Sequence, residues 1–255
     1  MTTAFDVEWL RARLPGRRIE YVARTGSTML DAEALLREGC AHGSVAIAGE
    51  QVAGQGRLGR SWHSEPGAGL YASVVLRLPL PAPQLPLVTL ALGLAAVDAI
   101  ALGAGLRCDL RWPNDVLARG RKCAGILVQN HEDALIAGIG INANHEQFPE
   151  AVGDVAISLR MVTGREQSRE LLLLALLDSI DRRTAQLVND GADAILQDFA
   201  KASSFVRGRR VAVEDSGRRL TGVTEGLDPA GFLILRTDAG ARELVMSGGV
   251  RPLEA

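Results

Sequence analysis

A glycine-rich basic segment, residues 54–62 with the sequence GQGRLGRSW, is the feature that most constrains how this chain can fold. The apolar, β-branched run from Ser44 to Ala48 precedes it, and an alternating run from Leu70 to Arg77 follows it. We therefore predict a loop between two strands. Its glycines let backbone N–H groups approach a ligand closely.

The three glycines of this loop satisfy the dinucleotide-binding pattern G-x-G-x-x-G, but their context excludes that fold. The pattern requires a helix that opens at the last glycine. The stretch from Arg60 to Gly69 contains Trp62 and Pro66 and predicts no helix. Arg57 and Arg60 offer donors suited to a carboxylate or a phosphate. The loop is therefore interpreted as an anion clamp, with a solvated surface loop as the alternative.

Length and composition are typical of a globular protein with one large domain and a small one. The chain has 255 residues, of which 47% are hydrophobic and 23% charged. Its N-terminal segment has acidic residues where a signal peptide would be basic, and the apolar run Leu85–Leu106 contains Asp98, so no membrane association is expected. Three cysteines without C-x-x-C spacing favour a reducing cytoplasm. A net charge of −2 argues against DNA as a partner.

Apolar periodicity and capping residues predict several further elements. Strands are expected at Arg18–Ala23, at the start of Leu106–Gln129, from Cys123 onward and at Ala134–Ile141. Helices are expected at Asp6–Leu14, from Ser27 or Thr28 to Glu38, at Leu87–Leu102, at Ser168–Asn189 and onward to about Ser203. The all-round apolar character of Leu87–Leu102 indicates a buried helix. From Val206 to Ala255, short alternating runs separated by turn residues indicate a small β-barrel or SH3-like domain. We therefore expect domains at 1–205 and 206–255.

The loop Trp112-Pro113-Asn114-Asp115 interrupts a strand and is expected to expose an aromatic ring, an amide and a carboxylate together. Lys122 follows it closely. The chain has 26 arginines and only two lysines, so this lysine stands out. A compact ammonium can bridge a carboxylate and a phosphate, which a planar guanidinium does less well. The alternatives are a solvated lysine and, for Asp115, a turn residue.

Together these motifs resemble those of the biotin protein ligases, which join biotin to a lysine of a carrier protein through biotinyl-AMP. The family's G-R-G-R-x-G-R-x-W matches Gly54–Trp62 except at Gln55, and its K-W-P-N-D matches Arg111–Asp115. Its K-x-x-G-I-L matches Lys122–Leu127, and its G-I-N-x-N matches Gly140–Asn144. Four ordered motifs are far more specific than any one. The resemblance implies an α+β fold, a mixed β-sheet packed against helices followed by a small C-terminal SH3-like barrel.

The resemblance also implies roles for individual residues. The ureido ring of biotin would be held by Ser27, Thr28 and Gln51, with Gly54, Gln55 and Gly125 in the same biotin site. The carboxylate and the α-phosphate would meet Arg57 and Lys122, and the adenylate side would be formed by Arg60, Trp62, Asn114 and Asn142. Asp115 resembles an acidic residue near the metal and the acceptor lysine. Because Gln55 replaces a family arginine, we expect biotinyl-AMP to be held more loosely.

The implied reaction uses biotin, ATP and Mg²⁺, and its acceptor is a biotin carboxyl carrier protein. Biotin's carboxylate is already ionised, so its attack on the α-phosphate needs alignment by Arg57 and Lys122 and no base. The carrier lysine must lose a proton before it attacks, and Asp115 is the candidate acceptor. Mg²⁺ would come with ATP, and Asp115 is the residue that the resemblance implies as its ligand.

Three alternatives remain open at this stage. A lipoate or octanoate ligase or transferase shares the superfamily, and a sensor could bind biotin without catalysis. A biotin-responsive repressor would need a DNA-binding domain, and about 17 residues before the first strand are too few for a winged helix. Whether the protein is a monomer or a homodimer is left open by the sequence.

Overall fold

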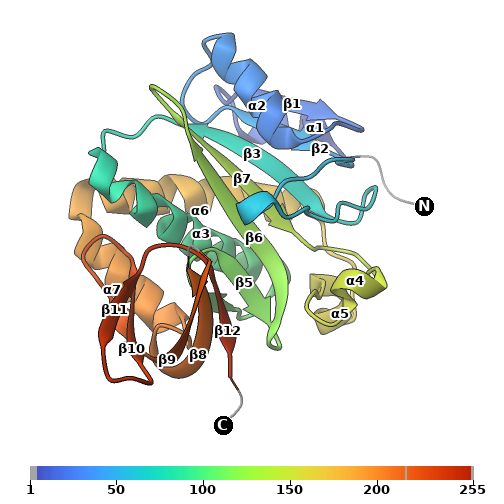
Figure 1. Cartoon of the computed structure of the whole chain (residues 1–255). Helices are drawn as coiled ribbons and strands as arrows, with labels where there is room; N and C mark the ends of the chain where they lie inside the picture. Colours follow the sequence, from blue (N-terminus) through green and yellow to red (C-terminus); the bar gives the residue numbers. More distant parts are fainter. Residues whose placement is uncertain (1–4, 216, 254–255) are drawn as a thin grey trace.

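A seven-stranded sheet forms the centre of the larger part of the chain (Figure 1). In the computed structural model, which describes residues 5–215 and 217–253, its strand order is β1-β2-β3-β7-β6-β5-β4. β1 pairs with β2 in parallel and all other neighbours are antiparallel, so the expected mixed sheet is confirmed. The strands are β1 Ile19–Val22, β2 Val45–Ala48, β3 Leu70–Leu76, β4 Asp109–Arg111, β5 Asp115–Ala118, β6 Arg121–Asn130 and β7 Leu135–Ile141.

Helices pack against this sheet, with α3 and α6 side by side against one face and α2 against β2, β3 and β7 on the other. The helices are α1 Val7–Arg13, α2 Thr28–Arg37, α3 Leu85–Ala104, α4 Glu150–Gly153, α5 Leu159–Thr163, α6 Arg169–Asp190 and α7 Ala192–Ala202, with short 3₁₀ turns η1 Arg57–Gly59 and η2 Ala82–Gln84. Side chains of Asp6, Ser27 and Ser168 accept hydrogen bonds from the first turns of α1, α2 and α6. The corresponding helix predictions are confirmed. The brief helices α4 and α5 were not predicted.

α3 is the core helix of the fold. The segment Ala82–Ala104 is long and apolar enough to cross a membrane by composition, with a mean hydropathy of 2.1, but most of it is buried between α6, α7 and the sheet. Its acidic residue Asp98 accepts hydrogen bonds from Arg183 of α6, which also bonds Asp198 of α7 at 2.8 Å. These two ion pairs join the three helices and explain the presence of a charge within an apolar run.

The strand after the glycine-rich loop does not expose alternate side chains, contrary to its alternating pattern. Every residue of β3 is buried. Val74 belongs to the core beneath α3 and α6, while Val75 belongs to a second, smaller core beneath α2. Because helices cover both faces, the central strand has no solvated side.

The Trp112–Asp115 loop corrects two expectations. The chain forms an extra strand, β5, between this loop and β6, so the region is a three-stranded meander and not two strands. The Trp112 ring is buried rather than exposed, at 3% exposure, and its Nε1 donates to the carbonyl of Gly231 at 2.9 Å. The aromatic residue of the motif therefore anchors the C-terminal sheet.

That C-terminal sheet has five antiparallel strands in the order β11-β10-β9-β8-β12. The strands are β8 Arg207–Asp215, β9 Arg218–Leu227, β10 Leu233–Thr237, β11 Arg242–Val245 and β12 Gly249–Pro252. The small SH3-like β-domain is confirmed, but in the described residues β11 and β12 remain edge strands, so the ladder does not close into a barrel. Its strand β9 contacts α7, and Figure 1 shows the sheet beside that helix.

Candidate active site

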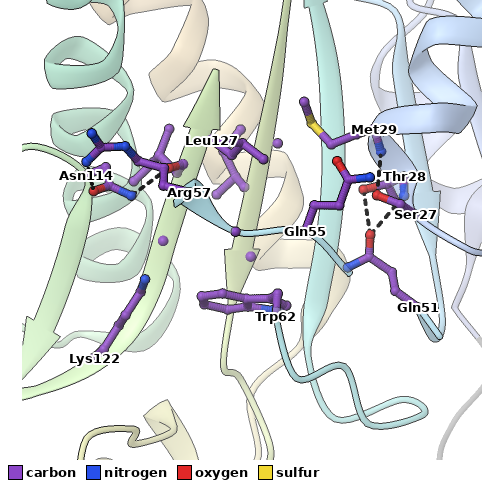
Figure 2. A pocket seen from close by; sticks show the side chains of 16 residues that line it. Ser27, Thr28, Met29, Gln51, Gln55, Arg57, Trp62, Asn114, Lys122 and Leu127 are labelled. Carbon is purple, nitrogen blue, oxygen red and sulfur yellow. Dashed lines mark hydrogen bonds between the residues drawn. The ribbon is translucent and has the colours of Figure 1, made fainter. Parts of the chain in front are cut away.

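The site contains a narrow pocket with one neutral end. The start of α2 and the segment that follows β2 form this end. Oε1 of Gln51 accepts from the backbone N–H of Thr28 at 2.8 Å and from its hydroxyl at 3.1 Å. The Thr28 hydroxyl also bonds Ser73 of β3 at 2.8 Å, and Nε2 of Gln51 donates to Ser64 at 3.0 Å. Ser27 and Thr28 are buried. This network fixes neutral donors and acceptors at one end of the pocket (Figure 2).

The floor of this pocket is a row of glycines across the sheet. Gly125 of β6 pairs with Gly140 of β7, and a Cβ at Gly140 would lie 2.5 Å from the indole of Trp62. A Cβ at Gly138 would lie 2.5 Å from the sulfur of Met29. Real Cβ contacts are never that close, so the glycines let Trp62 and Met29 lie directly on the strands. At both positions the group that lies close to β7 is thus a side chain of the protein itself.

Trp62 forms a wall of the narrow pocket and carries an unused donor. Its Nε1 is buried and has no hydrogen-bond partner among the described residues. The Lys122 ammonium lies 5.1 Å from the centre of the ring, a cation–π distance. Figure 2 shows Trp62 between the neutral end and the Lys122 side chain.

The opposite end of the narrow pocket is cationic. Arg57 donates from Nη1 to Oδ1 of Asn114 at 3.0 Å and to the carbonyl of Gly248, in the bend before β12, at 3.2 Å. Nδ2 of Asn114 in turn donates to the carbonyl of Ile126. Burial lowers the pKa of Arg57, although a guanidinium stays protonated at neutral pH. The whole pocket is lined by Ser27, Thr28, Met29, Gln51, Gln55, Gly56, Arg57, Trp62, Asn114, Lys122, Gly125, Ile126, Leu127, Gly138, Ile139 and Gly140.

Lys122 is positioned by an ion pair and by its backbone. Its Nζ lies 2.5 Å from Oδ1 of Asp115, whose Oδ2 lies 2.7 Å from Nη2 of Arg111. A register shift makes Cys123 an extra residue in β6, and bulges of this kind re-aim side chains next to active sites. The carbonyl of Lys122 accepts from Ile157 N at 3.0 Å.

Asp115 is a counter-ion here and a poor base. Burial opposes its charge, but the ion pairs with Lys122 and Arg111 outweigh burial and hold the pKa of Asp115 below its ordinary value. Both carboxylate oxygens are already engaged by cations. A Mg²⁺ ion at this carboxylate would face two positive side chains, so the residues present do not fit a resident metal at Asp115.

A second, wide pocket adjoins the narrow one and shares Trp62 and Lys122 with it. It has about 1570 Å³ of space, against about 440 Å³ for the narrow pocket. Elements of both sheets contribute to it. Its lining is Arg60, Ser61, Trp62, His63, Arg111, Asp115, Gly120, Lys122, Asn142, Phe148, Val152, Asp154, Val155, Ala156, Glu214, Gly249, Val250, Arg251 and Pro252.

The predicted site residues divide between these two pockets. Of those expected around biotin, all line the narrow pocket except Gly54, where a Cβ would lie 2.7 Å from the carbonyl of Trp62. Of those expected around ATP, Arg60 and Asn142 line the wide pocket, whereas Arg57 and Asn114 line the narrow one. The amide of Asn142 donates to backbone carbonyls of Lys122 and Ile157, so it also holds the strand in place.

Gln55 lies toward the neutral end of the pocket. Figure 2 shows its amide on the side of Ser27 and Thr28, away from Lys122. Sequence reasoning missed Ser73 and Arg111 as supports. A serine within the apolar run of β3 and an arginine four residues before Asp115 were the available signals.

Comparisons with known proteins agree with this architecture. The model of the "Biotin/lipoate A/B protein ligase family" matches residues 21–145, and that of the "Biotin protein ligase C terminal domain" matches residues 207–250. The biotin--[acetyl-CoA-carboxylase] ligase of Mycobacterium tuberculosis is 36% identical, with 96% of this chain and 94% of the relative covered. The bifunctional ligase/repressor BirA of Bacillus subtilis is 31% identical, with 92% and 74% covered. A biotin protein ligase from Aquifex aeolicus, solved in complex with biotin and ATP, has a TM-score of 0.81 at 28% identity, with 93% and 99% covered.

The mixed sheet, its C-terminal companion and the two joined pockets define a catalytic domain of the biotin and lipoate ligase class. Because the relatives match over most of their own length as well as most of this chain, the chain belongs to the biotin protein ligase family.

Proposed function

We propose that this protein is an ATP-dependent ligase that joins biotin to a lysine of a biotin carboxyl carrier protein through biotinyl-5′-AMP. The carrying observation is the polarity of the narrow pocket, which has a neutral hydrogen-bonding end at Thr28 and Gln51 and a cationic end at Arg57 and Lys122.

Biotin has the matching polarity. Its ureido group is neutral and both donates and accepts hydrogen bonds, while its carboxylate is ionised at the end of an aliphatic chain. We place the ureido ring at Ser27, Thr28 and Gln51 and the carboxylate near Arg57 and Lys122. The apolar chain would then pass over the glycine floor beside Trp62.

The junction of the two pockets is where the first reaction step would occur. Lys122 and Trp62 line both, so a carboxylate in the narrow pocket and an α-phosphate in the wide pocket would share the Lys122 ammonium. A carboxylate oxygen attacks phosphorus and pyrophosphate leaves, which needs alignment and charge stabilisation but no proton transfer. Asp115 and Arg111 hold Lys122 for this task. ATP enters as its magnesium complex, with the ion carried by the phosphates.

In the second step the carrier lysine attacks the mixed anhydride and AMP leaves. We assign Asp115 to positioning Lys122 in this step too, because a carboxylate with a depressed pKa and two paired cations is a weak proton acceptor. The lysine proton is then lost to solvent or to the leaving phosphate.

The deciding experiment incubates the full chain with biotin, MgATP and a carrier domain and follows the intact mass of the carrier. We expect a gain of one biotinyl group together with release of AMP and pyrophosphate. Parallel reactions with lipoate and octanoate serve as controls. Labelling with either of these but not with biotin would instead assign an acyl ligase. Biotin is favoured because its ureido group can add hydrogen bonds to the polar atoms at Thr28 and Gln51, whereas a purely apolar head group would cover these atoms without adding any.

Four further assignments accompany this proposal. We place the domain boundary between 205 and 206, since the described strands of the two sheets do not interleave. We place the reaction in the cytoplasm, where Cys40, Cys108 and Cys123 can remain the free thiols seen here. We expect no DNA binding because the net charge is −2. The acceptor that we propose is a biotin carboxyl carrier protein. This assignment does not depend on whether the ligase is a monomer or a homodimer.

A further inference from the structure

Three side chains with metal-binding atoms meet beside the wide pocket. His63 and Glu65 lie on the exposed segment after Trp62, and His145 lies just after the G-I-N-x-N motif at the end of β7. One ligand atom from each lies within 4.8 Å of the other two. His63 and His145 have ring centres 5.8 Å apart, and both rings are near Phe148.

The hydrogen bonds around His145 determine which ring nitrogen is free. The Tyr71 hydroxyl lies 3.1 Å from the carbonyl oxygen of Glu65 and 3.3 Å from Nε2 of His145. A carbonyl oxygen can only accept a hydrogen bond, so the hydroxyl of Tyr71 donates its single proton to the carbonyl of Glu65. Its oxygen must then accept from Nε2–H of His145. Nδ1 is therefore the nitrogen with an unprotonated lone pair.

This lone pair has no partner. His145 is fully buried, and within the described part of the chain its Nδ1 makes no hydrogen bond. Leaving a buried polar atom unpaired costs about 1–3 kcal/mol, so such atoms in native proteins call for a ligand or another explanation. The bond from Nε2 to Tyr71 also resembles the outer hydrogen bond that orients metal-binding histidines.

The donor set selects the chemical class of the ion. Two imidazoles and one carboxylate suit a borderline cation such as Zn²⁺, whereas Mg²⁺ prefers oxygen ligands. Bonds of about 2.0–2.1 Å in a tetrahedral site separate ligand atoms by about 3.3 Å. The present separations of up to 4.8 Å must therefore shorten when the ion binds. The side chains of His63 and Glu65 are exposed and can rotate toward the ion, while the buried His145 stays fixed.

We propose that His63, Glu65 and His145 form a Zn²⁺ site that ties the end of the glycine-rich loop to the segment after β7. A solvent molecule fills the fourth position. Because His63 directly follows Trp62, the bound ion restrains the chain that carries the wall shared by the two pockets. His63 also lines the wide pocket, whereas neither Glu65 nor His145 has been given a part in the ligation chemistry.

The test is direct metal binding by the full-length chain after treatment with a chelator and removal of the chelator. Zn²⁺ is titrated calorimetrically, and Co²⁺ is used as a probe because its visible absorption reports tetrahedral nitrogen and oxygen ligands. We expect one equivalent to bind and the melting temperature to rise. His63→Ala and Glu65→Gln, which alter exposed side chains, should each weaken binding by about tenfold or more.

The chain supplies its own matched controls, because its other two histidines are His42 and His131. His42→Ala and His131→Ala should bind Zn²⁺ as the native chain does. The proposal is overturned if the native chain binds no Zn²⁺, if His63→Ala binds as tightly as native, or if either control abolishes binding. No biotin enters this measurement, so its outcome is independent of the ligase assay.

Discussion

The two ends of the narrow pocket differ in charge and in how their polar groups are paired. At the neutral end, Thr28, Gln51, Ser64 and Ser73 satisfy one another before a ligand arrives. At the cationic end, the Lys122 ammonium is balanced by Asp115, and the Arg57 guanidinium is held by neutral oxygens of Asn114 and Gly248. Arg57 thus has no carboxylate partner in any ion pair described.

This difference indicates which substitutions should change the reaction rate and which should change the affinity for biotin. A neutral hydrogen bond contributes about 0.5–1.5 kcal/mol, so each contact at the neutral end tunes affinity modestly. An aligned charge at a reacting centre is worth about 10²- to 10³-fold in rate. Substitutions at the cationic end should therefore affect turnover, while those at the neutral end should affect the binding of biotin.

The largest effect is expected from Lys122→Ala. Adenylate formation, measured as pyrophosphate release with biotin and MgATP, should fall by about 10²- to 10³-fold with the fold intact. The matched control is Lys201→Ala, which removes the other lysine of the chain, an exposed residue of α7 paired with Asp198. Near-normal pyrophosphate release from Lys122→Ala would show that the cationic end does not act through this ammonium.

Asp115→Asn separates a positioning role from a proton-accepting one. We expect both half-reactions to slow together, because Lys122 and Arg111 lose their shared counter-ion. Single-turnover transfer from preformed biotinyl-AMP and pyrophosphate release are to be compared. A variant that slowed only the transfer, while forming adenylate normally, would identify Asp115 as the proton acceptor after all.

The same carboxylate gives the cationic end a pH dependence that the neutral end lacks. The pKa of Asp115 is lowered on folding, so its stabilising effect is complete above the unfolded value of about 3.9 and is lost as pH falls through the folded value. Asp115→Asn should lower the free energy of unfolding by about 2 kcal/mol at pH 7, between the costs for exposed and buried ion pairs. Denaturant unfolding should give the same difference at pH 5 and a smaller one below about pH 4. A difference unchanged at pH 3 would contradict this assignment.

Gly140→Ala tests the floor that joins the two ends. Its Cβ would lie 2.5 Å from the indole of Trp62, so the ring must move, at a cost of about 1–3 kcal/mol. Biotin and ATP should both bind more weakly by calorimetry, because Trp62 lines both pockets. Gly153→Ala, where the nearest neighbour is 3.8 Å away, is the control. Unchanged affinities in Gly140→Ala would mean that Trp62 can move aside freely.

The smallest effects should come from the neutral end. Thr28→Val removes the hydroxyl that bonds Gln51 and Ser73, and we expect biotin affinity to fall about fivefold, equivalent to about 1 kcal/mol. ATP affinity should not change. Thr25→Val is the control, since its hydroxyl bonds Asp31 outside the pocket lining. Equal losses of biotin and ATP affinity would show that the two ends are not independent.

Gln55 lies with the neutral end, which revises the consequence expected of its departure from the family pattern. An amide directed toward Ser27 and Thr28 is remote from the Lys122 end of the pocket. We therefore expect Gln55→Arg to release biotinyl-AMP at nearly the native rate in stopped-flow measurements. Slower release by the variant would contradict this expectation and would support an ionic contact between residue 55 and the adenylate, as the family pattern suggests.

Most elements and the members of the site followed from local sequence. Capping residues and apolar periodicity located α1, α2, α3, α6 and α7, because those signals are properties of a single segment. The four motifs contain ten of the sixteen residues that line the narrow pocket. β5 was missed because a four-residue strand after a proline has little periodicity of its own, and α4 and α5 are as short.

Other features depended on partners distant in the chain. The alternation of β3 could not reveal that helices cover both faces of the sheet, and nothing local shows that Trp112 reaches Gly231, 119 residues away. The need for glycine at 125 and 140 also comes from a ring carried by another segment.

The sequence by itself determined which side chains this protein has for binding an acid and a nucleotide, and the order in which the chain presents them. Only the tertiary structure decided that Arg57 and Asn114 meet at the end of the narrow pocket, and that Asp115 pairs with two cations instead of standing free as a base. The physical reason is that a pKa and an ion pair depend on distance and burial, which arise when strands and loops remote in sequence are brought together.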